Sequence, residues 1–274
     1  MRYIRIAAVV IFILSFALNA GAYAWDKVTE DTTPPEITCE EDTLQVRVDC
    51  EEEELLEGLK ARDDRDGDLT DQIIVAEMSH FIEKGVCSVK YVVFDSDHNW
   101  SEYTRTIEYT DYESPRFSMT QPQVYVQGED IRFLDSIKAS DVLEGDISNK
   151  IRVVSSDVDN YTPGTYPVQL EVTNSLGDTT SLDMNVTILD HEVSGPEIIL
   201  TKYLEYVNKG GSFDPEKYIS EVIDLYGEEL EDPEVTISGK VNTKKPGTYQ
   251  VVYKVSDENT ETQGQTCLTV VVTE

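Results

Sequence analysis

The sequence predicts an all-β fold of three tandem antiparallel β-sandwich domains after an N-terminal hydrophobic helix. The first observation is a repeat: Pro163–Val172 reads PGTYPVQLEV and returns at Pro246–Val255 as PGTYQVVYKV, with a looser copy, GVCSVKYVV, at Gly85–Val93. Copies about 80 residues apart indicate repeated modules. The second observation is a series of short runs with alternating apolar residues, separated by turn residues. Such runs are typical of small antiparallel sandwiches.

The expected domains are residues 35–112, 113–192 and 193–274, after a hydrophobic segment at 1–25 and a linker at 26–34. Each module opens on a proline followed by an alternating strand. Proline suits the start of a strand because its missing N–H need not join a ladder. These first strands are expected at 36–39, 116–119 and 197–200.

The order of elements is expected to be the same in each module. A second strand comes first, then an acidic segment with a short helix or turn, then a third strand. The Gly-Thr-Tyr strand follows, and a turn and a last alternating strand close the module. The helix or turn is expected at 53–59, 131–137 and 215–223, and the closing strand at 103–109, 182–189 and 265–272.

The N-terminal segment predicts export. Arg2 and Arg5 precede the uncharged run Ile6–Trp25, and positive charge before an apolar run keeps the N-terminus in the cytoplasm while the rest is exported. The run is long enough to anchor the chain in a membrane. Alternatively, Ala22-Tyr23-Ala24 is a signal-peptide cleavage site, and the protein is secreted after cleavage near Ala24. Both alternatives place the protein at the cell surface or outside the cell.

The composition excludes several classes of function. Lys and Arg number 22 against 54 Asp and Glu, which gives a formal net charge of -32. Such a surface repels nucleic acid and anionic membranes, so membrane contact is expected only through the N-terminal segment. The histidines His80, His98 and His191 form no recognisable nucleophile motif with Ser or Cys. The sequence therefore predicts neither an enzyme nor a cofactor.

The cysteines predict one disulfide, because exported chains enter an oxidising environment in which disulfides form. Cys39 is in step with Ile37, and Cys87 is in step with Val89, so both are expected to point inward. The other two modules place apolar pairs at the same positions, Met119 with Tyr166 and Leu200 with Tyr249. A disulfide in place of a buried apolar pair would give this pattern of residues. We therefore predict a Cys39–Cys87 disulfide.

The other two cysteines are expected to be far apart. Cys50 matches a turn, and Cys267 is out of step with Leu268, so it is expected to face water. Three states are considered for these two cysteines: free thiols, an intermolecular disulfide, and a Cys39–Cys50 disulfide.

The acidic run Asp63–Asp68 has two interpretations. An EF-hand loop needs carboxylates at the positions of Arg62 and Ile73, so that motif is excluded. Another oxygen cage could use Asp64, Asp66 and Asp68. The favoured interpretation is a tight turn in which these side chains accept backbone N–H groups and a glycine supplies the positive φ. No metal site is therefore predicted.

At these residues the chain resembles the bacterial Ig-like module first named from a pesticidal crystal protein, and its relative the hyalin repeat. The matching pattern is Pro-x-Ile, then Asp66–Thr70 (DGDLT), then the Pro-Gly-Thr-Tyr strand. The second module keeps Glu144–Ser148 (EGDIS), whereas the third departs at Tyr226–Leu230 (YGEEL). The resemblance implies Ig-like sandwiches that serve as spacers, adhesion units or enzyme accessories.

We therefore expect a non-enzymatic surface or secreted protein, a spacer or adhesion module for an unknown extracellular protein or glycan. One alternative is a polysaccharide-binding accessory protein, which predicts an aromatic patch on one outer face. Another is a subunit of a cell-envelope complex, which predicts an exposed apolar patch at a sheet edge.

Overall fold

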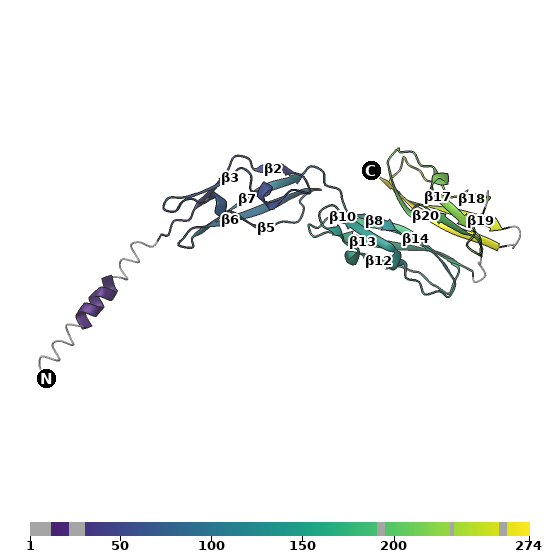
Figure 1. Cartoon of the computed structure of the whole chain (residues 1–274), viewed down its shortest axis with the longest axis horizontal. Helices are drawn as coiled ribbons and strands as arrows, with labels where there is room; N and C mark the ends of the chain where they lie inside the picture. The colour runs from purple at the N-terminus through teal and green to yellow at the C-terminus, as the bar shows by residue number, and fades with distance from the viewer. Residues whose placement is uncertain (1–11, 22–30, 191–194, 231–232, 258–261) are drawn as a thin grey trace, which may run out of the picture. The chain divides into compact units, whose positions relative to one another are not determined.

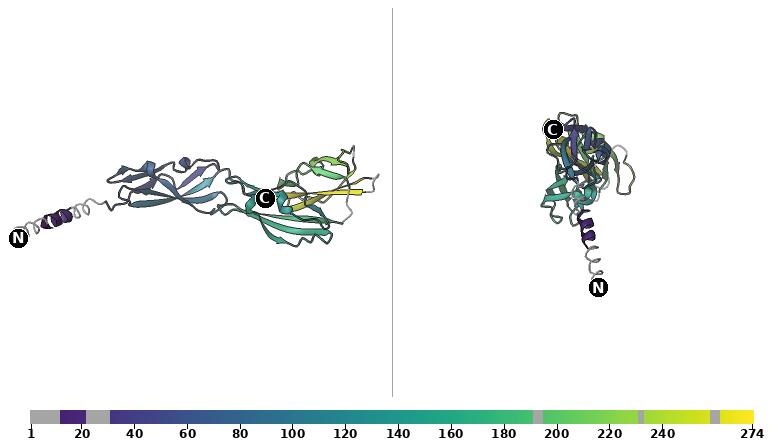
Figure 2. Two further views of the ribbon diagram at one scale, coloured as in Figure 1. Left: turned by 60° about the horizontal axis from the view of Figure 1, so that its bottom comes forward. Right: turned by 90° about the vertical axis from the view of Figure 1, so that its left-hand side faces the viewer.

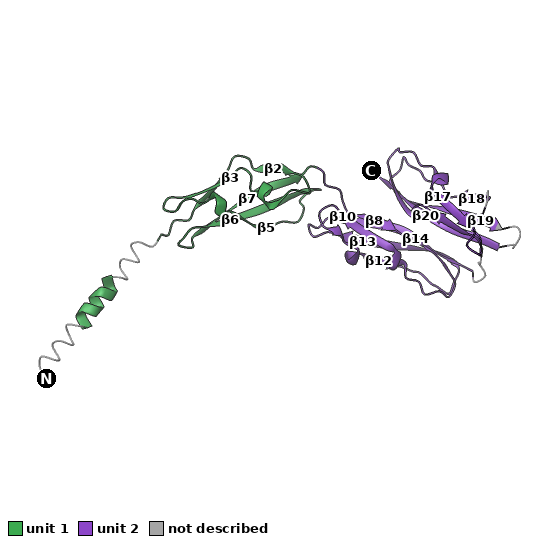
Figure 3. Ribbon diagram, viewed as in Figure 1, with its two compact units in different colours: residues 1–110 green, residues 111–274 purple. Residues whose placement is uncertain are grey.

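The computed structural model describes residues 12–21, 31–190, 195–230, 233–257 and 262–274. The chain forms two compact units, unit 1 (Met1–Thr110) and unit 2 (Asp111–Glu274), shown in Figure 3. The hydrophobic segment contains a helix over residues 12–21 (Figure 1). No helix in the described ranges is both long and apolar enough to cross a membrane. The predicted cleavage site at residues 22–24 lies outside the described residues.

Unit 1 is built from two sheets, and the predicted all-β fold is confirmed (Figure 1). The smaller sheet has the order β1-β3-β4, and the larger has the order β2-β7-β6-β5. The elements are β1 (Glu36–Cys39), β2 (Thr43–Val46), α2 (Glu52–Leu55), β3 (Leu59–Asp63), β4 (Gly67–Asp68), a 3-10 helix (Thr70–Gln72), β5 (Ile74–Met78), β6 (Val86–Phe94) and β7 (Trp100–Tyr109). Strand β2 pairs with β7 in parallel, and the other pairs are antiparallel.

Unit 2 begins with the same arrangement of elements. Its first two sheets have the orders β11-β10-β8 and β12-β13-β14-β9. The elements are β8 (Arg116–Met119), β9 (Val124–Val126), a 3-10 helix (Phe133–Ser136), β10 (Ile137–Asp141), β11 (Gly145–Asp146), a 3-10 helix (Ser148–Lys150), β12 (Arg152–Ser156), β13 (Gly164–Thr173) and β14 (Thr179–Leu189). Strand β9 pairs with β14 in parallel, as β2 does with β7.

The remainder of unit 2 contains two more sheets, β15-β17 and β16-β20-β19-β18. The elements are β15 (Glu197–Leu200), β16 (Leu204–Asn208), a 3-10 helix (Pro215–Tyr218), β17 (Ile219–Ile223), β18 (Val235–Ser238), β19 (Gly247–Asp257) and β20 (Thr262–Thr273). The departure at Tyr226–Leu230 has a structural counterpart: Ile223 makes only an isolated bridge with Glu229, where the other modules form the short strands β4 and β11.

The core is formed by the inner faces of the long hairpins β6–β7, β13–β14 and β19–β20. In β6 buried and half-buried residues alternate along the strand, and Val89, Tyr91 and Val93 are fully buried. Successive side chains of a strand point to opposite faces of its sheet, so this alternation leaves one face for the core. Burial of such side chains contributes roughly 1.5–3 kcal/mol each.

Three strands were not expected from the sequence: β3 and β10 begin at the last residue of the expected helix or turn, and β17 lies within the range 215–223. The short helices end early, and the chain then enters β3, β10 and β17. In β3 the inner face holds Leu59, Ala61 and Asp63, while Lys60 and Arg62 point outward. The inner face has only two apolar side chains, one of them small, so the alternation is weak. The sequence therefore does not predict this strand.

Unit 2 also contains a junction that the sequence did not predict. Leu204 belongs to the buried cluster formed mainly by β8, β10, β13 and β14, and Tyr206 packs against that cluster. The Tyr206 hydroxyl accepts a hydrogen bond from the Phe117 backbone N–H at 3.0 Å, and the Arg116 guanidinium lies 5.4 Å from the Tyr206 ring centroid. Strand β8 lies next to β16 and β14 next to β19, and the two parts of unit 2 lie side by side in Figures 1 and 2.

Strand β20 shows the consequence of this junction. Leu268 and Val270 face their own core, and the alternate residues Cys267 and Thr269 are also buried. The expectation that Cys267 faces water is therefore wrong. It does point away from its own core, but the other part of unit 2 covers that face, and the Val271 side chain packs on the neighbouring cluster.

We predict that Tyr206 holds the two parts of unit 2 together. Tyr206→Ala should lower the free energy of unfolding of unit 2 by about 2–3 kcal/mol, because it removes a mostly buried ring. Tyr206→Phe should cost only about 1 kcal/mol, the value of one hydrogen bond. Urea unfolding of both variants checks this order. Equal losses would contradict a junction held by ring packing.

Candidate functional site

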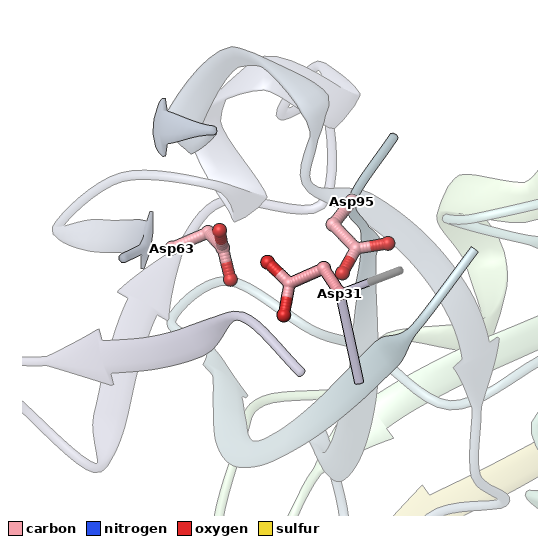
Figure 4. Close-up of side chains that lie close together, drawn as sticks. All are labelled: Asp31, Asp63 and Asp95. Carbon is pink, nitrogen blue, oxygen red and sulfur yellow. The ribbon is translucent and has the colours of Figure 1, made fainter. Parts of the chain in front are cut away.

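Three carboxylates converge at one end of unit 1 (Figure 4). Asp63 ends β3, Asp95 follows β6, and Asp31 lies in the segment before β1. One oxygen from each side chain lies within 4.8 Å of the others. Asp63 is 3% exposed and Asp95 is 8% exposed, so two of the three acidic groups are shielded from water.

Hydrogen bonds from the neighbouring turns hold these side chains. Asp63 Oδ1 accepts the backbone N–H groups of Arg65 at 2.7 Å and Asp66 at 2.9 Å. Asp95 accepts the backbone N–H of Asn99 and its side-chain Nδ2, both at 2.7 Å. The same Asn99 Nδ2 donates to the Asp31 carbonyl oxygen at 2.9 Å. The cluster therefore fastens the segment before β1 to the turns after β3 and β6.

The predicted turn residues also accept backbone N–H groups. Asp66 accepts the Ser96 backbone N–H at 2.7 Å and the Ser96 hydroxyl at 3.0 Å. Asp68 accepts the Thr70 backbone N–H at 3.0 Å and its hydroxyl at 2.6 Å. Gly67 has φ of 82°, which a side chain would strain. The Asp68 contacts and the positive φ of Gly67 are those of a tight turn, whereas Asp66 connects this turn to Ser96 in the turn after β6.

The alternative cage of Asp64, Asp66 and Asp68 is not among the carboxylate groups that converge within the described ranges; the converging group is Asp31, Asp63 and Asp95. Carboxylate oxygens are ligands for calcium and magnesium, but calcium takes about six to eight oxygen ligands in all, which include carbonyls and waters. Since oxygens of all three side chains already accept the turn hydrogen bonds, we assign the cluster a structural role.

Unit 2 builds the same corner with different chemistry. Asp141 ends β10 as Asp63 ends β3, but Asn174 stands after β13 where unit 1 has an aspartate. Asn174 Nδ2 donates to Asp141 Oδ2 at 3.1 Å and to the Tyr112 hydroxyl at 2.9 Å. The Tyr112 hydroxyl in turn donates to Asp178 at 2.8 Å. A neutral amide and a phenol thus separate two carboxylates, whereas unit 1 brings three together.

Sequence reasoning missed this corner. Asp31 lies in the expected linker at 26–34, and Asp95 lies in the expected turn before the closing strand at 103–109, so the sequence gives no reason for them to meet Asp63. One signal was present in the sequence: Asp63 and Asp141 occupy the same position relative to the Gly-Asp pairs of their turns, Gly67-Asp68 and Gly145-Asp146. The partner residues lie far along the chain, and only the fold brings them to the same end of the sandwich.

The predicted Cys39–Cys87 disulfide is absent, and all four cysteines carry thiols. The Cys39 thiol donates to the Glu41 carbonyl at 3.1 Å and lies 3.5 Å from Arg105 Nη1. Arg105 is the physical reason, because it occupies an inward position that the other modules give to an apolar residue. It is 3% exposed, and it donates to the carbonyls of Leu55 and Glu57 at the end of α2.

One outer sheet face of unit 1 carries an exposed apolar patch. Phe94 and Trp100 are direct cross-strand partners at the end of the β6–β7 hairpin, 45% and 54% exposed. Val92 lies two residues before Phe94, and its partner Ile74 in the edge strand β5 is 51% exposed. Ile74, Val92, Phe94 and Trp100 form what we call the Phe94–Trp100 patch.

Comparisons with known proteins agree with this fold. Residues 201–270 match the family described as bacterial surface protein, Ig-like domain. The pesticidal crystal protein Cry22Aa of Bacillus thuringiensis is 30% identical over 207 residues, which cover 73% of this chain and 27% of that protein. The chain thus matches only about a quarter of the length of this relative.

Similar solved structures include domains of ZmpB from Clostridium perfringens (CBM51-2 in complex with GlcNAc, and INT). They are 20% identical, cover 54% of this chain and 26% of that chain, and have a TM-score of 0.23. The lipoprotein BT2262 of Bacteroides thetaiotaomicron is 16% identical, with coverages of 53% and 61% and a TM-score of 0.24. Drosophila N-cadherin EC1-4 is 14% identical, with coverages of 90% and 76% and a TM-score of 0.21. Likenesses this weak carry no argument about function.

We predict two classes of thiol. Burial raises the pKa of Cys87 to about 11, and it also raises the pKa of the buried Cys267. The thiolate is the nucleophile, so these two thiols should react slowly with a disulfide reagent at pH 8. Cys39 and Cys50 are only half-buried and should react first. Mass spectrometry of the labelled peptides measures this order; rapid labelling of Cys87 would contradict it.

We also predict a pH response at the turn aspartates. The Thr70 hydroxyl, and then its backbone N–H, hold the pKa of Asp68 below its ordinary value of 3.8. The stabilisation is present above the ordinary pKa and is lost as the pH falls through the lowered one. Thr70→Val should raise the pKa of Asp68, measured by NMR titration. Asp146, whose pKa is lowered first by the Ser148 hydroxyl, is the control and should not move.

Proposed function

Because the chain belongs to the bacterial Ig-like family of surface-protein domains, we propose that it is a non-enzymatic surface protein that acts as a spacer and adhesion module. Domains of this family are typically non-catalytic. The sandwiches supply a stable frame, and the outer sheet faces supply the contacts.

The observation that carries the adhesive role is the Phe94–Trp100 patch. Val93, the neighbour of Phe94 in β6, is fully buried. Successive side chains of a strand point to opposite faces of its sheet, so Phe94 and its cross-strand partner Trp100 point away from the core. Exposed aromatic side chains that lie together on an otherwise charged protein mark interaction sites. Large rings that are already fixed by their strands lose little conformational entropy on binding.

The charge around the patch indicates the chemistry of the partner. Asp95 and Asp97 lie in the turn that joins Phe94 to Trp100, and the whole chain carries a formal net charge of -32. A Lys90–Glu102 ion pair, 3.4 Å between Nζ and Oε2, borders the patch on the same two strands. A protein surface that offers cationic and apolar side chains complements this arrangement, since a guanidinium or ammonium group stacks on aromatic rings.

Two alternatives have support from particular residues. A polysaccharide-binding accessory protein would use the same rings to stack on sugar faces. A subunit of a cell-envelope complex would use the edge strand β12, where Val153 is 41% exposed and Val154 is 50% exposed. An unpaired edge with apolar side chains is suited to strand pairing with another chain.

The test is an array of extracellular-matrix proteins and glycans probed with the full chain. We expect Phe94→Ala with Trp100→Ala to weaken binding to a basic matrix protein at least tenfold. Tyr226→Ala is the matched control, because this tyrosine is 88% exposed on unit 2, and it should leave binding unchanged. Binding confined to glycans favours the polysaccharide alternative. If the chain binds nothing on the array, the adhesive role is contradicted and only the spacer role is left.

A further inference from the structure

Unit 2 contains a polar cleft at the junction of its two parts. Its volume is about 370 Å³, within the range of small-ligand sites, about 300–1,000 Å³. The cleft lies between the outer faces of two sheets, one with β12, β13 and β14 and the other with β19 and β20. It is remote in sequence from the Phe94–Trp100 patch, which belongs to unit 1.

The floor of the cleft is a row of polar side chains fixed by strand register. Gln169 of β13 pairs with Ser155 of β12 on one side and with Asp183 of β14 on the other. Asn185 lies in the next row of β14, opposite Pro167. Residues between them, such as Val168 and Met184, are buried in the core, so the polar set shares the outer face.

The facing wall comes from the other part of unit 2. Thr248 and Gln250 of β19 line it together with Thr269, the cross-strand partner of Gln250. Asn185 Nδ2 donates to Gln250 Oε1 at 3.4 Å and so connects floor and wall. Most of the lining residues lie on the interior strands β13, β14, β19 and β20, so the register of paired strands sets the positions of their backbones.

The lining restricts the class of ligand. Among the described residues that line the cleft none is basic, and Asp183 carries negative charge, so an anion is disfavoured. Strands β13, β14, β19 and β20 each have a strand on both sides. Their backbone groups are therefore already paired, so these four strands offer a ligand their side chains and no free edge; β12, which contributes Ser155, is the one edge strand among the lining strands.

What remains is recognition by side chains alone. Amides donate and accept, a carboxylate accepts, and hydroxyls do both. A ring with several neighbouring hydroxyls complements such a set, because each hydroxyl is also a donor and an acceptor. We propose that this cleft binds a neutral saccharide. The inference goes beyond the proposed adhesive contact of unit 1 and does not depend on it.

The test is calorimetric titration of the full chain with a panel of neutral sugars: glucose, galactose, mannose and N-acetylglucosamine, with their short oligomers. We expect at least one to bind, and Gln169→Ala with Asp183→Ala to weaken it at least tenfold. Galacturonic acid, which carries a carboxylate, should bind more weakly than galactose.

The matched control is Glu171→Ala with Ser181→Ala, the next pair along the same two strands and outside the cleft. It should bind within twofold of the unchanged chain, with circular dichroism confirming that both variants fold. The proposal is overturned if no neutral sugar of the panel binds, or if the floor variant and the control bind alike. Loss of binding only in the Phe94→Ala, Trp100→Ala variant would also overturn it.

Discussion

Burial of one face of the long β-hairpins is the interaction on which the rest of the structure depends. In each hairpin the alternate residues of both strands enter a core, as Val89 does in β6, Leu170 in β13 and Val251 in β19. The free energy gained by apolar burial is proportional to the area removed from water, so these positions favour apolar side chains; Arg105 of β7 is an inward exception. The intervening positions carry no such restriction. They vary between the modules, and the candidate functional surfaces lie there.

The turns at the hairpin ends show how much chemistry the same scaffold accepts. The turn after β6 uses Asp95 to accept from Asn99, and the turn after β13 uses Asn174 to accept from Asp178. Either order satisfies the backbone N–H group that closes the turn, so the fold is preserved. The charge differs, because one corner gathers three carboxylates and the other places an amide and a phenol between two.

The outer sheet faces of the long hairpins are covered at β20 in unit 2 and exposed at the end of β6 and β7 in unit 1. The outer face of β20 is covered within unit 2, which buries Cys267 and leaves a polar cleft beside the junction. The outer face at the end of β6 and β7 retains the exposed aromatic pair Phe94 and Trp100 within the described part of unit 1. The covered face makes unit 2 stiffer, and the exposed apolar face of unit 1 is the surface to which we assign the proposed adhesive contact.

Local sequence is sufficient to predict the strands with strong alternation, the first strands after each proline and the turn at Gly67 and Asp68, because these depend on neighbours in the chain. Weak alternation hid β3, and phase alone placed Cys39 opposite Cys87 although the inward Arg105 lies beside Cys39. Which outer faces are covered and which carboxylates meet can be seen only in the folded chain. Those contacts join residues far apart in sequence, and strand periodicity assigns a side chain to a face without saying what lies against it.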